Sequence, residues 1–365
     1  MDELLYQIGL TQLPLVGPVN ARQLIAYCGS ARDVFTARKK ELLLIPGIGE
    51  QIARSILEQD VLQIAERELH FIEQHQIQAL FYLHKDYPAR LRAYNDAPVL
   101  LYYQGNAGLD HPRTVAIVGT RKPSIQGLQS CEALVEGLRA YDVQIISGLA
   151  YGVDICAHRA CLAAGVPTLG VLGHGLARIY PAGHRTVARQ MCEQGGLLSE
   201  YTSITQPERE HFPMRNRIVA GLCDALIVVE TARKGGSMIT ANFANDYNKD
   251  VFAFPGRRND PHSEGCNLLI KSHRAALIES AEDIAYVMRW EENDQNRPIQ
   301  TQLFIELSTE EKLIVDLLRE QDTVGIDRLT LATQLKGSTL ATLLLNLEFK
   351  GMIKTLPGKR YALIQ

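Results

Sequence analysis

Closely spaced cysteines and paired histidines are missing from this sequence, which limits the chemistry that it can carry. The 365 residues include seven cysteines, an odd number, scattered along the chain and never spaced as CxxC. That usage is typical of reduced thiols rather than of a disulfide framework. The ten histidines form neither an HExxH motif nor a paired Cys/His spacing, the usual signatures of zinc sites. We therefore predict no metal site.

Long apolar runs are also missing. The stretch 160–177 has no charged residue but is interrupted by four glycines and a proline, so it does not predict a membrane span. The first residues, Met-Asp-Glu-Leu-Leu, lack the basic start and the small-residue cleavage site of a signal peptide. We expect a cytoplasmic protein without a membrane partner.

The sequence also lacks a strong excess of positive charge. The formal net charge is -3, whereas phosphate binding needs lysine and arginine. Residues 1–83 carry 7 basic and 10 acidic side chains, residues 84–290 carry 22 and 20, and residues 291–365 carry 9 and 11. Only the middle segment is positive, so we expect any polyanion site to be a local cluster.

Apolar residues, at 46% of the chain, are frequent enough to build cores, and this length predicts about two to three domains. From about residue 80, β-branched runs alternate with helix-length segments. This alternation predicts a Rossmann-like, doubly wound, mostly parallel α/β sheet. The expected strands are 114–118, 143–147, 168–172, 197–200, 225–230, 251–254 and 276–278. The expected helices are 126–140, 154–164, 185–194, 215–223, 237–248 and 281–290.

The N-terminal segment contains a repeat. Residues 45–53, Ile-Pro-Gly-Ile-Gly-Glu-Gln-Ile-Ala, fit a helix-hairpin-helix turn, and a degenerate copy 32 residues upstream has Leu15 where the first glycine, Gly47, is expected. Such turns can direct backbone amides at a phosphate. They can equally be packing units of a small SAM-like helical domain, and both interpretations stay open.

The C-terminal segment predicts a winged helix. Ser308 and Glu311 form a capping box for its first helix, two more helices follow, and a β-hairpin is expected to turn near Gly358. The third helix contains residues 339–348 and no lysine or arginine, which favours protein binding over DNA contact. We thus predict a helical domain at 1–79, a Rossmann-like domain at 80–290, a linker at 291–305 and a winged helix at 306–365.

Glycine, hydroxyl and basic residues gather in four loops that follow predicted strands, where open α/β sheets bind ligands. The sharpest anion signal is Lys234-Gly235-Gly236-Ser237, because glycines before a helix can form a phosphate nest beside a lysine. The other three loops are 118–124, 147–154 and 212–221. Each has a structural alternative: an ordinary turn, tight strand-to-helix packing, or a salt bridge made by one arginine. None matches GxGxxG or a P-loop, so we predict no cofactor.

Six motifs together resemble those of the DNA-processing protein A (DprA, or Smf) family. They are VAIVGTRKPS (115–124), SGLAYGVDICAH (147–158), YPAGHR (180–185), FPMRNRIVAG (212–221), KGGSMITA (234–241) and FPGR (254–257). The chain departs from the family pattern at Gly173-His174-Gly175, where Cys-Gly is frequent, and at Gly235, where serine is common.

The resemblance implies a non-enzymatic, homodimeric protein that binds single-stranded DNA. It also implies that the protein protects incoming strands during natural transformation and loads the RecA recombinase onto them. Arg121 and Lys234 match basic positions of the family's binding pocket, and we expect Tyr151 to stack on a base. The residues expected to contact DNA are Gly119, Thr120, Arg121, Lys122, Ser147, Gly148, Tyr151, Arg215, Asn216, Lys234, Gly235, Gly236 and Ser237.

Two other functions stay open on the sequence. A nucleoside-monophosphate phosphoribohydrolase shares this type of architecture, with Asp154 and Glu230 as the nearby carboxylates, but the loop lacks the proline and downstream glutamate of such enzymes. A nucleotide-sensing protein is the other alternative. Release of free base from AMP would identify the first, and mononucleotide binding without oligonucleotide binding the second.

Overall fold

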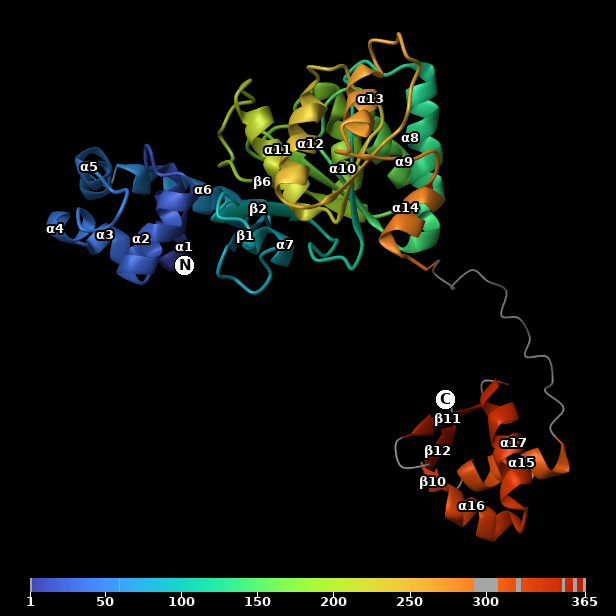
Figure 1. Cartoon of the computed structure of the whole chain (residues 1–365). Coiled ribbons are helices and arrows are strands. Elements are labelled where there is room, and N and C mark those ends of the chain that lie inside the picture. Colours follow the sequence, from blue (N-terminus) through green and yellow to red (C-terminus); the bar gives the residue numbers. More distant parts are fainter. Residues whose placement is uncertain are drawn as a thin grey trace. The chain divides into compact units, whose positions relative to one another are not determined.

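The computed structural model describes residues 2–58, 60–291, 308–319, 323–349, 352–356 and 360–363 (Figure 1). The chain forms two compact units, residues 1–293 and residues 294–365. Within the described ranges, the helices lack the combination of length and hydrophobicity that crossing a membrane requires.

The first unit is built on a mixed sheet with the strand order β1-β2-β6-β5-β4-β3-β7-β8-β9. Pairing is antiparallel between β1 and β2 and between β2 and β6, and it is parallel from β6 to β9. The strands are β1 (Gln78–Phe81), β2 (Leu100–Gly105), β3 (Thr114–Val118), β4 (Gln144–Ser147), β5 (Thr168–Leu172), β6 (Gly195–Ser199), β7 (Ala225–Val228), β8 (Asp250–Ala253) and β9 (Ala276–Leu277). The predicted mostly parallel sheet is confirmed; β1 and β2 were not among the predicted strands.

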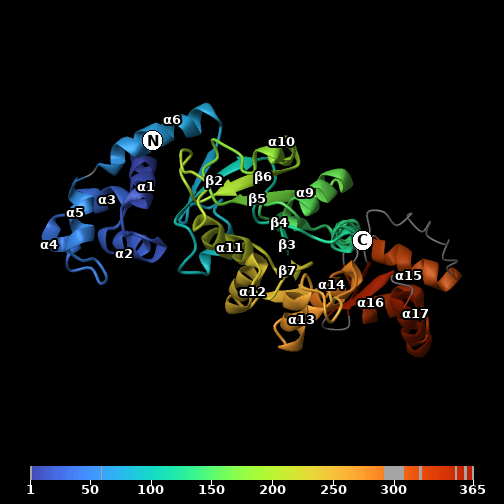
Figure 2. The same cartoon turned by 90° about the horizontal axis from the view of Figure 1, so that it is seen from above.

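Helices cover both faces of this sheet (Figure 2). One face carries α8 (Ile125–Leu138), α9 (Val153–Ala164), α10 (Arg185–Gln194) and α14 (Ala281–Met288), and the other carries α11 (His211–Leu222), α12 (Gly236–Asp246) and α13 (Glu264–Lys271). Side chains alternate between the faces of a strand. In β3, Val115 and Ile117 therefore pack with α8 and α9, whereas Ala116 and Val118 pack with α11 and α12. The doubly wound prediction is confirmed.

Six N-terminal helices share one apolar cluster with β1 and β2. They are α1 (Asp2–Gln12), α2 (Pro18–Cys28), α3 (Ala31–Thr36), α4 (Lys39–Leu42), α5 (Glu50–Glu58) and α6 (Val61–Gln74). The predicted boundary between residues 79 and 80 falls inside β1, and the domain boundaries stay predictions.

Both copies of the helix-hairpin-helix repeat form the same turn. Gly47 has a φ of 82° and Leu15, its counterpart, a φ of 64°. The backbone hydrogen bonds also match, from Val16 to Leu13 at 3.2 Å and from Ile48 to Ile45 at 3.1 Å. Leucine rarely adopts this left-handed conformation, so packing of the flanking helices holds the degenerate copy in shape.

The second unit has the helix and hairpin order predicted for a winged helix. It contains α15 (Thr309–Arg319), β10 (Val324–Gly325), α16 (Ile326–Thr333), α17 (Gly337–Phe349), β11 (Ile353–Leu356) and β12 (Arg360–Leu363), with the strand order β10-β12-β11. The predicted capping box is confirmed by hydrogen bonds between Ser308 and Glu311 in both directions. Residues 292–305 of the predicted linker and the turn near Gly358 lie outside the described residues.

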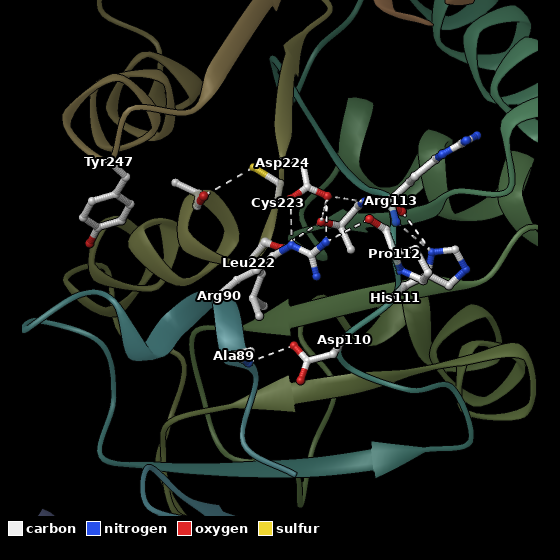
Figure 3. Close-up of polar contacts among 12 residues, drawn as sticks. Ala89, Arg90, Asp110, His111, Pro112, Arg113, Leu222, Cys223, Asp224 and Tyr247 are labelled. Carbon is white, nitrogen blue, oxygen red and sulfur yellow. Dashed lines mark hydrogen bonds and ion pairs between the residues drawn. The ribbon is translucent and has the colours of Figure 1, made fainter. Parts of the chain in front are cut away.

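Asp224 fastens the amino ends of β3 and β7, together with α7 (Ala89–Arg92) (Figure 3). Its carboxylate accepts hydrogen bonds from Nε and Nη2 of Arg90, both at 2.8 Å, and from the Thr114 amide at 2.8 Å. Burial alone would raise the pKa of Asp224, but the hydrogen bonds from Arg90 and Thr114 outweigh it and hold the pKa below its usual value. This contact lies at the end of the strands opposite to the four glycine-containing loops.

Candidate nucleic-acid interface

The carboxyl ends of β3, β4 and β7 border a single cavity of about 630 Å³, here called the sheet-edge cavity. All four segments singled out from the sequence contribute to its wall, but the third, 212–221, lies within helix α11 rather than in a loop. Of the residues expected to contact DNA, it is lined by Gly119, Thr120, Arg121, Gly148, Arg215, Asn216, Gly235, Gly236 and Ser237.

Four expected residues do not line this cavity. Ser147 is fully buried, and its hydroxyl donates to the carbonyl of Ile117 at 2.5 Å, so it supports the strands instead. Tyr151 lines an adjoining pocket and is 56% exposed, with its ring edge-on to that of His184 at 5.0 Å. Lys122 and Lys234 have exposed side chains in the first and fourth loops.

Arg215 lies in the first turns of α11 at the floor of the cavity, and only 5% of it is exposed. Its Nη1 donates to the carbonyl of Val171, while its Nε has no hydrogen-bond partner among the described residues. A Cβ on Gly148 would lie 2.3 Å from Oδ2 of Asp154 and 2.5 Å from Nη2 of Arg215. Glycine is therefore required for this loop to pass so close to both charged groups.

Burial and charge act in opposite directions on these two groups. Burial raises the pKa of Asp154, and the Arg215 charge opposes that rise. Burial likewise lowers the pKa of Arg215, and the Asp154 carboxylate opposes that fall. Because Asp154 partly compensates Arg215, the exposed guanidinium groups of Arg121 and Arg209 are the cavity cations best suited to an incoming anion. The neighbouring Arg217 instead pairs with Glu200, which matches the salt-bridge alternative considered for this loop.

The fourth loop presents backbone amides at the start of α12. Gly235 is the residue before the helix, so the amides of Gly236 and Ser237 precede its first helical hydrogen bond. The Ser237 hydroxyl donates to Oγ1 of Thr231 at 2.7 Å, and a Cβ on Gly235 would lie 2.2 Å from that same oxygen. The Ser237–Thr231 hydrogen bond and the close packing at Gly235 place the N-terminus of α12 at the border of the cavity. A helix N-terminus in this position is suited to binding an anion.

The loop that carries Arg121 is fixed on both sides. The Thr120 amide donates to the Glu230 carbonyl at 2.7 Å, and the Thr120 carbonyl accepts from the Val153 amide at 3.2 Å. Gly152 has a φ of 83°, and a Cβ there would lie 2.2 Å from the Thr120 carbonyl oxygen. The Arg121 guanidinium lies 5.7 Å from the centre of the Phe212 ring.

The Glu230 carboxylate, considered above for hydrolysis, holds Ser124, the residue that caps α8. It accepts from the Ser124 amide at 2.8 Å and from the Ser124 hydroxyl at 2.5 Å. Asp154 accepts from the Ala150 amide at 3.2 Å and lies against Arg215. Both carboxylates therefore have structural roles at this edge of the sheet.

Among the residues of the cavity wall that were not predicted as contacts are Tyr180, Arg209 and Phe212. Tyr180 is 49% exposed, and its ring centre lies 6.0 Å from that of Phe212. Both aromatic residues fall in motifs that carried the family resemblance, so the sequence could have indicated them as contacts. Arg209 sits between two glutamates in a loop and carried no signal of its own.

Comparison with known proteins covers most of the chain. The family model for DNA recombination-mediator protein A matches residues 78–289, that for the DprA winged helix domain matches 301–359, and that for the SAM-like helix-hairpin-helix tandem matches 8–59. Protein Smf of Synechocystis sp. is 30% identical over 398 residues, covering 99% of this chain and 98% of its own. DNA processing protein DprA of Streptococcus pneumoniae is 43% identical over 198 residues, covering 54% and 70%.

Two solved structures are similar as well. That of DNA processing protein A from Streptococcus pneumoniae has a TM-score of 0.68 and 32% identity, covering 80% of this chain and 99% of its own. That of DNA processing protein A from Helicobacter pylori, solved to describe its single-stranded DNA binding mode, has a TM-score of 0.54 and 32% identity, covering 59% and 98%. The family models match segments of both units, and the chain belongs to the DprA (Smf) family of DNA recombination-mediator proteins.

Proposed function

We propose that the sheet-edge cavity binds single-stranded DNA. The observation that carries this proposal is the meeting of exposed arginines, helix N-terminal amides and aromatic rings in one cavity. Phosphates would lie at Arg121, Arg209 and the start of α12, and bases would stack on Tyr180 or Phe212. The Helicobacter pylori relative, named for single-stranded DNA binding, supports the same ligand class.

A compact site agrees with the charge of the chain. The net charge of -3 provides no basic coat for a duplex, whereas a few local cations can neutralise a few phosphates. The cavity volume of about 630 Å³ is typical of pockets that enclose small groups, which span about 300–1,000 Å³. Backbone and stacking contacts read little sequence, so the base preference should be slight.

Fluorescence anisotropy with a labelled oligothymidine tests the site. Arg121→Ala should weaken binding about tenfold, because it removes a charge-assisted contact, and should reduce the slope of log affinity against log salt by about 0.7. Lys234→Ala should weaken binding less, since its side chain does not line the cavity. Arg139→Ala is the control: it removes an exposed arginine that pairs with Glu136 on α8. Affinity and slope equal to wild type in Arg121→Ala would overturn the proposed site.

We also propose that the bound strand is protected and passed to a RecA-type recombinase. A recombinase needs the bases of the strand accessible, and a binder that holds a few phosphates in a cavity leaves most of a long strand free. Filament formation by RecA on strands covered with a single-strand-binding protein should accelerate when the wild-type chain is added. Equal acceleration by Arg121→Ala would contradict a handover that depends on this cavity.

Homodimer formation completes the proposal. The outer edge of β9 ends the sheet, and Leu277 on this strand is 50% exposed. Exposed strand edges with apolar side chains favour pairing with another chain. Light scattering of wild type and Leu277→Asp measures the dimer directly: a monomeric variant supports this edge as the interface, and an unchanged mass contradicts it.

We propose a binding protein without catalytic activity, because Asp154 and Glu230 are held by Ala150, Arg215 and Ser124. Incubation with AMP should release no free base. Release of adenine by wild type that is lost in Glu230→Gln would contradict this part of the proposal.

A further inference from the structure

Glu68 of α6 is a buried carboxylate that lies outside the sheet-edge cavity. It is 3% exposed, and both of its oxygens accept from the Ser203 amide at 2.9 Å. Its Oε2 also accepts from the Ser203 hydroxyl at 2.5 Å. Burial raises the pKa of Glu68, and the hydrogen bonds from Ser203 oppose that rise. A glutamate is seldom buried unless it holds a specific partner, and here that partner is a loop of the α/β sheet.

The loop held by Glu68 joins β6 to α11 and comprises residues 200–210, here called the β6–α11 loop. Its other side packs on the segment that follows β5. The Gly175 amide donates to the Thr205 carbonyl at 3.1 Å, and a Cβ on Gly175 would lie 2.0 Å from the Thr202 carbonyl oxygen. Thr202 and Ser203 are 2% and 3% exposed. The first half of the loop is therefore clamped between α6 and the end of β5.

The second half of the same loop reaches the cavity. Pro207 and Arg209 line the cavity wall, and both follow Ser203 closely in sequence. An exposed arginine on a loop without anchors samples many positions, and ordering it on binding costs conformational entropy. A loop that is already anchored loses less conformational entropy when the ligand binds.

We propose that Glu68 is a positioning residue for DNA binding. By holding Ser203, it fixes the β6–α11 loop so that Arg209 faces the sheet-edge cavity. The N-terminal helices thereby contribute to affinity without touching the nucleic acid. This inference rests on the proposed function, and it links the buried contact between Glu68 and Ser203 to DNA binding at the sheet-edge cavity.

A double-mutant cycle on the full chain separates positioning from simple destabilisation, with oligothymidine anisotropy as the readout. Glu68→Ala and Arg209→Ala should each weaken binding about fivefold, as expected for loss of one charged contact. Each should also lower the salt slope by about 0.7. The double variant should bind no more weakly than Arg209→Ala alone, because Glu68 acts only through that arginine.

Two further variants control the chemistry at Glu68. Glu68→Gln should keep wild-type affinity, since its amide oxygen can accept from the Ser203 amide and its NH₂ can donate to the Ser203 hydroxyl. Glu66→Ala removes an exposed carboxylate from the same helix and should leave affinity unchanged. If Glu68→Ala does not fold, Ser203→Ala replaces it in the cycle, with a smaller loss of affinity that is again non-additive with Arg209→Ala.

The possible failures are distinguishable. If Arg121→Ala and Arg209→Ala weaken binding but Glu68→Ala or its substitute does not, only this inference is overturned. Losses at Glu68 and Arg209 that add in full also overturn it, because they indicate independent effects. If the wild-type chain does not bind the oligonucleotide, the proposed function fails, and the inference fails with it.

Discussion

Removal of the Asp224 carboxylate should destabilise the first unit without weakening DNA binding. This side chain ties α7 to the amino ends of β3 and β7, at the opposite end of the strands from the cavity (Figure 3). Asp224→Ala removes the acceptor of the Thr114 amide and the charge that balances Arg90, whose Nη2 keeps a hydrogen bond to the Pro112 carbonyl at 3.2 Å. The predicted effect is therefore on the free energy of unfolding alone.

The magnitude follows from the burial of the pair. The side chains of Arg90 and Asp224 are 19% and 28% exposed, and their shortest distance is 2.8 Å. Removal of one partner of a fully buried ion pair costs about 3–5 kcal/mol. Water can reach this partly exposed site, so we expect about 2–3 kcal/mol for Asp224→Ala. Asp224→Asn keeps one acceptor and should cost about 1–2 kcal/mol.

Urea unfolding followed by the fluorescence of Trp290 measures the loss. This single tryptophan lies in the first unit, with the Arg113 guanidinium 5.8 Å from its ring centre. Asp246→Asn, an exposed substitution at the end of α12, is the control and should stay within about 0.5 kcal/mol of wild type. Stability of Asp224→Ala equal to that control, or a loss of oligothymidine affinity as large as that of Arg121→Ala, would refute the reasoning.

Three other predictions concern the backbone, a buried histidine and the second unit. Gly152→Ala should displace the Arg121 loop, because φ is 83° and the new Cβ meets the Thr120 carbonyl, and anisotropy should record weaker DNA binding alongside about 1–3 kcal/mol of lost stability. Burial lowers the pKa of His158 from 6.5 to about 4. The unfolded chain therefore binds the proton first, so urea unfolding should give a stability that is complete above pH 6.5 and falls by about 3 kcal/mol towards pH 4. In α17, Leu344 is 2% and Leu345 51% exposed. Calorimetry should therefore record that the free energy of unfolding falls by about 2–5 kcal/mol in Leu344→Ala and by less than about 0.5 kcal/mol in Leu345→Ala.

Each of these has its own contradicting result. Gly183→Ala, where a Cβ meets nothing within 4 Å, should keep wild-type affinity, and an equal loss at both glycines would remove the steric argument. If the free energy of unfolding of His158→Gln shows the same pH dependence between pH 6.5 and pH 4 as wild type, groups other than His158 cause that dependence. Equal losses of unfolding free energy in Leu344→Ala and Leu345→Ala would contradict the packing described for the second unit.

The parallel core of the sheet was predictable because its strands are short apolar runs. β3 and β5 have the predicted bounds, 114–118 and 168–172, and every residue in them is buried. Strands β1 and β2, at one end of the sheet, were missed, since they pair antiparallel and no alternation with long helices marks them. Helix α11 begins four residues before the predicted Arg215, because the proline at 213 is tolerated within a first helical turn.

The candidate site was predictable as loops but not as individual contacts. Strand carboxyl ends in an open α/β sheet meet at one edge, and the three predicted loops line one cavity together with the start of α11, which holds the fourth segment. Which side chains face the cavity depends on tertiary contacts that no local pattern encodes. Ser147 turns into the sheet to reach Ile117, and Arg209 belongs to a loop held by Glu68, 135 positions before its partner Ser203.

Photocrosslinking of a thiothymidine-containing oligonucleotide to the full chain tests the sheet-edge cavity most directly. Stacking of bases on the aromatic residues of the cavity wall predicts crosslinks at Tyr180 and Phe212, and their loss in Arg121→Ala. Crosslinks confined to the N-terminal helices or to the second unit, and unaffected by Arg121→Ala, would contradict the cavity as the DNA-binding site.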